Sequence, residues 1–266
     1  MSDTTGSNNL IFFFSGTGNN IAIAKKVKAE LGGELIRITN KLLWSRQAYT
    51  ADKCIIIYPS YGYGAPRLVH KFFHAAHIRA DYIAILVSYG SAPGAAGIQI
   101  KKILEKKGRQ ADLYLSIRSV ENFIPIFGLD EQKKHKSLIK HAEHTAAAIE
   151  MIRAGAKNKP RRFYPLGSMV SGILIWALPI LNRMYKISDK CNGCGVCVRA
   201  CPGGAMVQNA RAKPEFVARG CELCQACLNL CPMRAISFVR LNAKSPRYLH
   251  PEVSAGELQA DNEKRK

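Results

Sequence analysis

The sequence predicts an α/β fold: a doubly wound, five-stranded parallel sheet within residues 1–155, followed by a smaller α+β domain rich in cysteine. Three observations lead to it. Apolar runs alternate with helical patterns in the first half, a glycine-rich loop follows the first apolar run, and two copies of one cysteine pattern occupy the second half. A chain of 266 residues has room for both domains.

Short apolar runs bounded by polar or glycine-rich segments predict the strands, and longer periodic stretches predict the helices between them. We expect strands at 10–14, 34–38, 54–58, 82–88 and 113–119, and helices at 21–31, 67–78, 95–107 and 130–153. Alternation of strands and helices places helices on both faces of a parallel sheet. Ligands of such sheets bind beyond the carboxyl ends of the strands, at the topological switch point.

The loop after the first strand is a candidate anion site. It reads Ser15-Gly16-Thr17-Gly18-Asn19-Asn20 and leads into a helix. Backbone N–H groups at such a helix start face a phosphate, and the hydroxyls of Ser15 and Thr17 add donors. The loop lacks the Gly-Lys-Ser/Thr ending of a Walker A motif, and Ile21 stands where a dinucleotide fingerprint needs its last glycine. The alternative is a strand-to-helix turn without a ligand.

Two further loops, 59–66 and 88–94, follow the third and fourth strands and combine glycine with tyrosine. Glycine permits close approach of the backbone, and tyrosine stacks on a flat ring. We expect Tyr61, Tyr63 and Tyr89 to stack on a ligand, the alternative being that they cap the core. Asn122, just after the fifth strand, is a further candidate for the same pocket.

Each cysteine pattern reads C-x2-C-x2-C-x3-C-P, the spacing that wraps three thiolates around one iron–sulfur cube. Glycines within the first copy let the loop fold closely around a cluster, and the final proline stops it from wrapping further. In two-cluster ferredoxins the fourth cysteine ligates the other cluster. Cluster I would then be bound by Cys191, Cys194, Cys197 and Cys231, and cluster II by Cys221, Cys224, Cys227 and Cys201.

Three alternatives to two clusters are weaker. A disulfide framework does not suit a chain whose start, MSDTTGSNN, lacks the features of a secretory signal. Zinc sites usually pair their cysteines as two separated CxxC units. Binding of a single cluster would leave four well-spaced ligands unused. We therefore expect oxygen-sensitive thiolates in a reducing compartment, the cytoplasm.

The formal net charge of +20 is high for an electron carrier. Bound clusters and a flavin phosphate would offset only part of it. The remainder favours an acidic redox partner protein, or an anionic membrane surface at which the chain would lie peripherally. No nucleic-acid recognition motif accompanies the charge, so we expect no nucleic-acid partner.

The segment 163–181 contains nineteen residues without a charge, which raises the question of a membrane span. Pro165, Pro179 and basic residues on both flanks argue against one. We expect residues 156–186 to form a linker with a bridging helix, with attachment to a membrane surface as the alternative. The cluster domain follows at 187–240. The tail at 241–266 is polar and charged, and we expect disorder there.

Other conspicuous side chains have simpler interpretations. Cys54 has no partner motif and is expected to be a buried structural thiol. His70, His74 and His77 share one predicted helix, but without a nearby carboxylate we interpret them as solvated or core residues rather than a metal site. The lysines of 133–140 predict an exposed helix face, with docking of an acidic partner as the alternative.

Together the loop and the cysteine patterns resemble the family of flavodoxin–ferredoxin fusions, over roughly residues 10–155 and 187–240. The resemblance implies a flavodoxin-like fold that binds FMN, with its monophosphate on loop 15–20 and its ring between the tyrosine loops, and two [4Fe–4S] clusters. Asn20 departs from the family, in which Ser or Thr is common there. The implied flavin-binding residues are Ser15, Gly16, Thr17, Gly18, Asn19, Asn20, Tyr61, Gly62, Tyr63, Gly64, Ser88, Tyr89, Gly90, Ser91 and Asn122.

The function that these observations favour is electron transfer between FMN, the two clusters and a partner redox enzyme. Two alternatives are a flavin-dependent oxidoreductase acting on a small substrate such as a quinone, and an electron-transfer adaptor at a membrane surface. The sequence contains no nucleophile–base pair for hydrolysis and no second nucleotide fingerprint for NAD(P)H.

Overall fold

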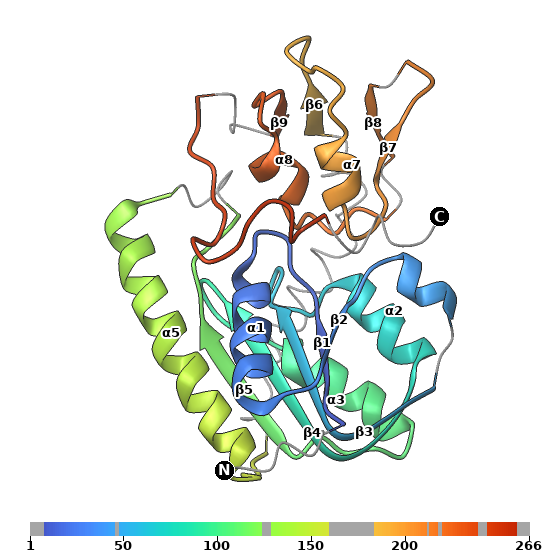
Figure 1. Cartoon of the computed structure of the whole chain (residues 1–266), viewed down its shortest axis with the longest axis vertical. Coiled ribbons are helices and arrows are strands. Elements are labelled where there is room, and N and C mark those ends of the chain that lie inside the picture. Colours follow the sequence, from blue (N-terminus) through green and yellow to red (C-terminus); the bar gives the residue numbers. More distant parts are fainter. Residues whose placement is uncertain are drawn as a thin grey trace.

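The computed structural model describes residues 8–45, 48–123, 129–159, 184–211, 213–217, 220–238 and 244–259. We refer to 8–159 as the N-terminal domain, 184–238 as the cysteine domain and 244–259 as the C-terminal segment. The cysteine domain lies beyond one end of the sheet of the N-terminal domain (Figure 1), and the C-terminal segment runs back along their junction.

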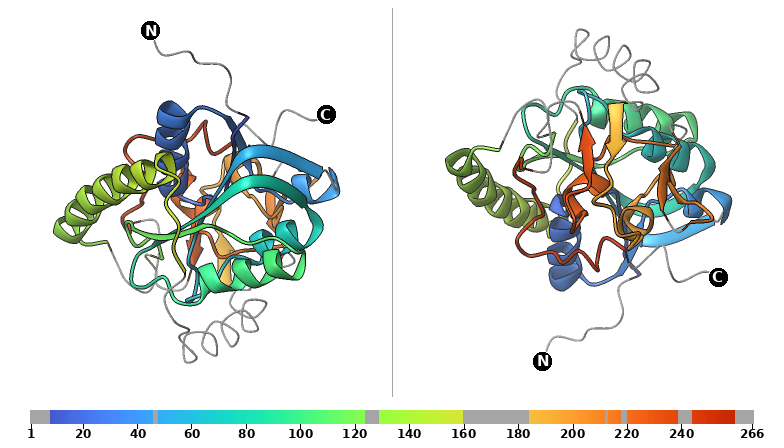
Figure 2. Two further views of the ribbon diagram at one scale, coloured as in Figure 1. Left: turned by 90° about the horizontal axis from the view of Figure 1, so that it is seen from below. Right: turned by 90° about the horizontal axis from the view of Figure 1, so that it is seen from above.

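The N-terminal domain has the predicted doubly wound fold. Its five parallel strands are arranged in the order β2-β1-β3-β4-β5, the order of flavodoxin-like sheets. Helices α1 and α5 cover one face and α2 and α3 the other (Figure 2). The bounds are β1 (Leu10–Phe13), α1 (Asn19–Leu31), β2 (Glu34–Arg37), the 3-10 helix η1 (Lys41–Ser45), β3 (Ala48–Pro59), α2 (Arg67–Ala75), β4 (His77–Tyr89), α3 (Ala96–Lys106), β5 (Leu113–Arg118) and α5 (Glu131–Arg153).

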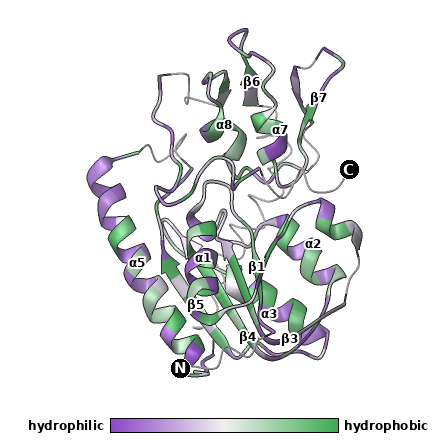
Figure 3. Ribbon diagram, in the orientation of Figure 1, coloured by the Kyte–Doolittle hydropathy of each residue, from purple (hydrophilic) through white to green (hydrophobic). Residues whose placement is uncertain are grey.

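Strands β1, β3 and β4 are apolar because helices cover both of their faces (Figure 3). Phe12 stands at the centre of an aromatic cluster, 4.9 Å from the ring of Tyr49 and 5.1 Å from that of Phe72. The strand order reverses at β1, whose neighbours are β2 and β3. The topological switch point therefore lies beyond the carboxyl ends of β1 and β3.

One helix assignment was wrong at its end. Helix α2 stops at Ala75, and His77 begins strand β4 instead of sharing a helix with His70 and His74. The next residue, Ala76, adopts an extended conformation, and β4 then pairs with β3 from His77↔Ala48 onwards. Backbone pairing between the first residues of β3 and β4 thus overrides the helical periodicity of the three histidines. His70 lies within reach of Gln99, with Nε2 and Oε1 3.2 Å apart, and burial lowers its pKa.

The cysteine domain contains two small antiparallel sheets and two short helices. Strands β6 (Tyr185–Ile187) and β9 (Ile236–Phe238) pair, as do β7 (Met206–Gln208) and β8 (Pro214–Phe216). Helices α7 (Val196–Ala200) and α8 (Ala226–Leu230) each contain the third cysteine of one pattern. The two cysteine patterns therefore sit in equivalent loop–helix units, as an internal repeat requires.

The C-terminal segment corrects the expectation of a disordered tail. Tyr248, Val253 and Leu258 are all buried, and Leu258 has no exposed surface. Arg37 donates through Nη1 to the carbonyl oxygen of Leu258 at 2.6 Å, which holds the segment against strand β2. The polar composition of the region hides these three apolar anchors, which are spaced five residues apart.

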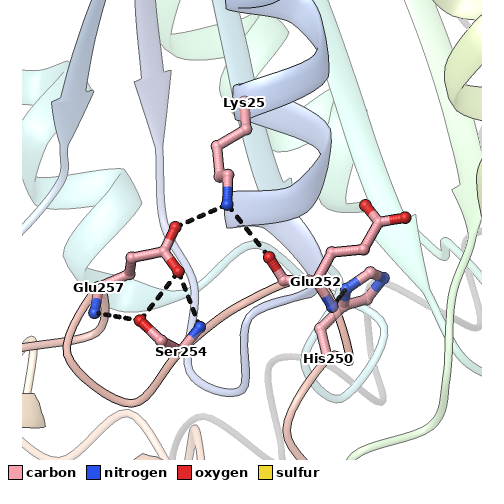
Figure 4. Close-up of polar contacts among 5 residues, drawn as sticks. All are labelled: Lys25, His250, Glu252, Ser254 and Glu257. Carbon is pink, nitrogen blue, oxygen red and sulfur yellow. Dashed lines mark hydrogen bonds and ion pairs between the residues drawn. The ribbon is translucent and has the colours of Figure 1, made fainter.

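Lys25 on α1 holds the segment from a second side (Figure 4). Its Nζ donates to the carbonyl oxygen of Glu252 at 3.1 Å and to the carboxylate of Glu257 at 2.8 Å. The second oxygen of that carboxylate accepts from the backbone N–H of Ser254 at 2.7 Å, which closes a tight turn. A short stretch with few apolar residues is thereby fixed by hydrogen bonds to its backbone and to the Glu257 side chain.

Residues 160–183 lie outside the described residues, and with them most of the expected linker and the apolar stretch 163–181. Among the helices that the described ranges contain, none combines the length and apolarity needed to cross a membrane.

Truncating the buried anchor of the C-terminal segment should destabilise the chain. We expect Leu258→Ala to lower the free energy of unfolding by about 2–5 kcal/mol, because it removes a fully buried side chain. Urea denaturation followed by circular dichroism measures the change. Ile139→Ala, at a position 47% exposed on α5, is the control and should stay within about 0.5 kcal/mol. An unchanged midpoint in Leu258→Ala would mean that the segment is not packed in solution.

Candidate flavin and iron–sulfur sites

A pocket of about 330 Å³, including the part open to solvent, lies at the carboxyl ends of β1, β3, β4 and β5, where the switch point predicts a ligand. It brings together ten of the predicted flavin-binding residues: Ser15, Gly16, Thr17, Asn19, Asn20, Tyr61, Ser88, Tyr89, Gly90 and Asn122. Five predicted residues do not line it: Gly18, Gly62, Tyr63, Gly64 and Ser91. We call this cavity the flavin pocket.

Five lining residues were missed by sequence reasoning: Pro59, Ser60, Ser119, Val120 and Glu121. They end strand β3 or follow strands β3 and β5, so their position at the carboxyl ends of predicted strands was the signal that could have identified them. The loops at this edge are bonded to one another. The N–H of Ser60 donates to the carbonyl of Ser88, and that of Ser119 to the carbonyl of Tyr89, both at 2.8 Å.

Loop 15–20 has a conformation suited to a phosphate. Gly18 adopts a left-handed conformation with φ of 95°, which lets the backbone turn into α1. Its N–H donates to the hydroxyl of Ser15 at 3.1 Å. Among the described residues no acceptor contacts the backbone N–H groups of Gly16, Thr17, Asn19 and Asn20. These donors are available for an anion at the start of a helix.

Three buried polar atoms of the pocket also call for a ligand. Asn20 Oδ1, Ser60 Oγ and the Tyr61 hydroxyl oxygen are shielded from solvent and have no hydrogen-bond partner within the described chain. Leaving such atoms unpaired costs free energy, about 1–3 kcal/mol each. Asn20 itself is fixed, since its Nδ2 donates to the carbonyl of Phe14 at 2.8 Å. A ligand with polar atoms, such as FMN, fits this lining.

The tyrosine loops differ in what they place at the pocket. Tyr61 and Tyr89 line it, whereas Tyr63 sits at a tight turn with φ of 65° and is 40% exposed. The turn is closed by backbone hydrogen bonds between Tyr61 and Gly64 at 2.8 and 3.0 Å. Burial, together with the nearby Cys224, raises the pKa of Tyr61, so its hydroxyl stays protonated. Two tyrosines, rather than three, are placed to contact a flat ring.

A second pocket, of about 300 Å³ including the part open to solvent, lies within the cysteine domain. It is lined by Cys191, Cys194, Cys197 and Cys231, the four residues predicted to bind cluster I. The N–H of Ala235 donates to Cys231 Sγ at 3.3 Å. The last cysteine of the second pattern therefore faces the first three of the other.

Cys201 correspondingly approaches Cys221, Cys224 and Cys227, and its charge contributes to raising the pKa of each of these three thiols. The approach depends on Gly203 and Gly220, whose loops are in contact. A Cβ on Gly203 would lie 1.9 Å from the carbonyl oxygen of Gly220. Glycine is required here because a side chain would separate Cys201 from the second pattern.

Burial is the main cause of the raised cysteine pKa values, and mutual repulsion of the thiolates adds to it. The pKa of Cys197 rises to about 11 and that of Cys221 to about 12. A bound metal lowers the pKa of its thiol ligands and deprotonates them. In the described part of the chain, no three His, Cys, Asp or Glu side chains are arranged to hold a single metal ion. The motif spacing instead specifies a larger group, the four-iron cube.

The second cysteine loop lies directly on the flavin pocket. A Cβ on Gly16 would stand 2.3 Å from the carbonyl oxygen of Cys224, so the two loops are in contact. Arg67, the first residue of α2, donates through Nη2 to the carbonyl of Cys221 at 2.6 Å and pairs with Glu222 at 3.8 Å. Loop 221–224 therefore joins the two domains at the edge of the pocket.

The C-terminal segment is hydrogen-bonded to loop 15–20. Tyr248 donates its hydroxyl to Asn19 Oδ1 at 2.6 Å, and the N–H of His250 donates to the carbonyl of Thr17 at 3.0 Å. The N–H of Tyr248 in turn donates to Asn229 Oδ1 on α8 at 2.8 Å. The segment thus connects helix α8, which contains Cys227, to loop 15–20, a role that its composition did not reveal.

His250 also packs against a buried histidine of α5. The rings of His141 and His250 are 5.0 Å apart, and His141 Nδ1 lies 2.8 Å from the hydroxyl of Ser119. Burial is the main reason that the pKa of His141 falls to about 3 and that of His250 to about 4. Both rings are therefore neutral in the folded protein near pH 7.

Comparison with protein families matches residues 190–235 to the 4Fe-4S dicluster domain. No curated protein matches the chain. Among solved structures it is similar to a putative flavoprotein from Bacteroides uniformis (16% identity, TM-score 0.36, covering 44% of this chain and 94% of the other). It is also similar to Megasphaera elsdenii flavodoxin (19%, 0.32, 52% and 98%) and to a flavodoxin from the domain Archaea (14%, 0.30, 53% and 99%).

The strand order and the matched dicluster domain together fit a flavodoxin–ferredoxin fusion, as the sequence predicted. The fold assignment of the N-terminal domain rests on its own topology, since the order β2-β1-β3-β4-β5 is that of the flavodoxin-like sheet.

The buried histidine pair predicts a loss of stability in mild acid. An unfolded histidine has a pKa of about 6.5, so the unfolded chain takes up protons that the folded chain excludes as the pH falls from 6.5 toward 4. Each histidine then reduces stability by up to about 1.4 kcal/mol per pH unit. We expect His141→Gln to lose less stability than the wild type between pH 7.5 and 5.0, measured by urea denaturation.

The exposed His135 on the same helix provides the control, and His135→Gln should lose as much stability as the wild type. Equal losses in His141→Gln and the wild type would contradict a buried, neutral His141.

Proposed function

We propose that this chain is an electron-transfer flavoprotein that holds FMN and two [4Fe–4S] clusters and exchanges electrons with an acidic redox partner. The observation that carries the proposal is the contact between loop 221–224 and Gly16, which sets one complete cysteine ligand set against the flavin pocket. Cofactors held this way would exchange electrons within one chain, without a diffusing carrier.

In this proposal loop 15–20 binds the FMN monophosphate through the backbone N–H groups of Gly16, Thr17, Asn19 and Asn20. Thr17 is positioned by Asn122, whose Nδ2 donates to Thr17 Oγ1 at 3.0 Å, and its hydroxyl proton remains free to point at the phosphate. Asn20 replaces the family's hydroxyl with an amide whose Oδ1 lines the pocket. Tyr61 and Tyr89 orient the ring between the β3 and β4 loops.

Cluster I would be held by Cys191, Cys194, Cys197 and Cys231, and cluster II by Cys221, Cys224, Cys227 and Cys201. When bound, the flavin supplies two-electron chemistry and the clusters one-electron transfer. The chain tunes the clusters through N–H···S hydrogen bonds, from Ala205 to Cys201 at 3.1 Å and from Leu223 to Cys221 at 3.5 Å. Burial of Cys224 and Cys227 excludes water from the side next to the flavin pocket.

The ligand assignment predicts a specific pattern of iron loss. Anaerobically purified wild-type protein should contain about eight irons per chain, as two cubes require. Cys231→Ala should damage cluster I while cluster II remains intact, seen as about four irons by chemical analysis and one set of electron paramagnetic resonance signals. Cys54→Ala removes a buried cysteine outside both patterns and should keep all eight. Loss of cluster II instead of cluster I would overturn the crossed ligation.

The flavin site is tested independently of iron. Thr17→Leu fills the buried phosphate loop with an apolar side chain and should lower the FMN content at least tenfold, measured by fluorescence of the extracted cofactor. The iron content should stay at about eight. Wild-type protein that retains both clusters but contains and binds no flavin would refute the proposal.

A further inference from the structure

The two cysteine sets differ in burial. In the set predicted to bind cluster II, three cysteines are buried and only Cys201 is partly exposed. In the set predicted to bind cluster I, only Cys197 is buried, Cys191 and Cys231 are partly exposed and Cys194 is exposed. Since both sets come from equivalent repeats, the difference arises from what packs against each.

The segments around the cluster II ligands contact the N-terminal domain. The carbonyl of Pro202, next to Cys201, accepts from the N–H of Asn40 at 2.7 Å, and the carbonyl of Cys221 accepts from Arg67 at 2.6 Å. Cys224 lies against Gly16 of the flavin pocket. Cluster II would therefore be the one next to the flavin.

The loop that carries the first cysteines of cluster I is bonded to the cysteine domain itself. The carbonyl of Cys194 accepts from Arg199 at 3.1 Å, and that of Gly193 from Gln208 at 3.4 Å. The loop lies between β6 and α7, at the end of the molecule away from the sheet (Figure 1). Cluster I would thus face solvent, where another protein can approach it.

Apolar side chains are exposed on the same domain. Met184, Val207, Val217 and Met233 are 37–44% exposed, and they make up four of the seven large hydrophobic residues exposed in the described ranges. Met233 lines the cluster I pocket. Met233 therefore places an exposed apolar side chain at the edge of the cluster I pocket, where a docked protein would cover it.

Positive charge accompanies these side chains. Within the described part of 184–238, the exposed charged residues are Lys186, Lys190, Arg211, Lys213 and Arg234 against Asp189 and Glu215. Three of the basic residues, Lys190, Lys213 and Arg234, directly adjoin residues that line the cluster I pocket, namely Cys191, Pro214 and Met233. One of the two acidic residues, Glu215, also adjoins this lining, so basic residues outnumber acidic ones there. A partner that docks there must be acidic to be complementary.

We propose that an acidic one-electron carrier protein docks on the cysteine domain over cluster I, around Met233, Lys190 and Lys213. This inference deepens the proposed function and rests on it. In each encounter one electron would pass between the carrier's centre and the chain, so that one is oxidised and the other reduced, with no bond made or broken. The lysines on α5 form the competing basic surface, 133–140.

The test measures binding, using an acidic plant-type [2Fe–2S] ferredoxin as the probe and the anaerobic holoprotein. Isothermal titration at low salt should show binding that weakens as salt is added. Lys190→Glu/Lys213→Glu should raise Kd about tenfold or more, because like charges then face each other. Lys136→Glu/Lys140→Glu on α5 is the matched control: it changes the net charge equally and should leave Kd within about twofold.

Iron and FMN contents of each sample are measured first, so loss of a cofactor, which would count against the proposed function, is recognised separately from loss of docking. A weaker Kd only in the α5 variant would overturn the docking site in favour of α5. Absence of ferredoxin binding, or binding to phosphatidylserine vesicles in its place, would overturn the protein partner.

Discussion

Loop 221–224 packs against Gly16 and Arg67, and this contact determines how the cysteine domain lies relative to the flavin pocket. It requires glycine at three positions, 16, 203 and 220, because the backbones approach so closely that a Cβ at each would overlap a carbonyl oxygen within 2.4 Å. Gly203 and Gly220 bring Cys201 to the second cysteine pattern, and Gly16 brings that pattern to the flavin pocket. One set of close backbone approaches therefore brings together the cysteines predicted to bind cluster II and places them next to the flavin pocket.

Charge supports the same contact. Glu222 is a buried carboxyl group whose pKa is raised by burial, and Arg67 and the backbone N–H groups that begin α2 offset part of this rise. A carboxylate of the cysteine domain thus stabilises the start of a helix in the N-terminal domain, where the helix dipole favours negative charge. Removing either Glu222 or Arg67 would leave a charge uncompensated at the domain junction.

Much of the fold could be predicted from the sequence, because the apolar runs of β1 and β4 and the glycine loop after β1 are strong local signals. The gathering of Cys191, Cys194, Cys197 and Cys231 around one pocket was equally predictable, since it follows from the repeated spacing of the two cysteine patterns. What sequence could not reveal depends on tertiary contacts. Nothing in the sequence distinguishes Ser119 and Glu121 from other loop residues, and they line the pocket only because β5 pairs with β4. Gly16 contacts Cys224, which is more than two hundred residues away in the sequence.

The C-terminal segment shows most clearly where prediction from composition fails. Its composition predicts disorder, yet three apolar side chains and the hydrogen bonds from Arg37 and Lys25 hold it in place. Average polarity is a poor guide when a few anchors enter a core that another domain has already built. Tyr63 illustrates the opposite case, since its aromatic ring suggested stacking but the turn between Tyr61 and Gly64 leaves it largely outside the pocket.

In the proposed arrangement cluster II, and not cluster I, adjoins the flavin. A crystal structure of the anaerobic holoprotein, with anomalous scattering recorded at the iron edge, would locate both clusters. We expect two iron sites, with the one held by Cys201, Cys221, Cys224 and Cys227 nearer to an FMN whose phosphate lies on loop 15–20. An FMN nearer to the irons of cluster I, or one bound outside the flavin pocket, would contradict it.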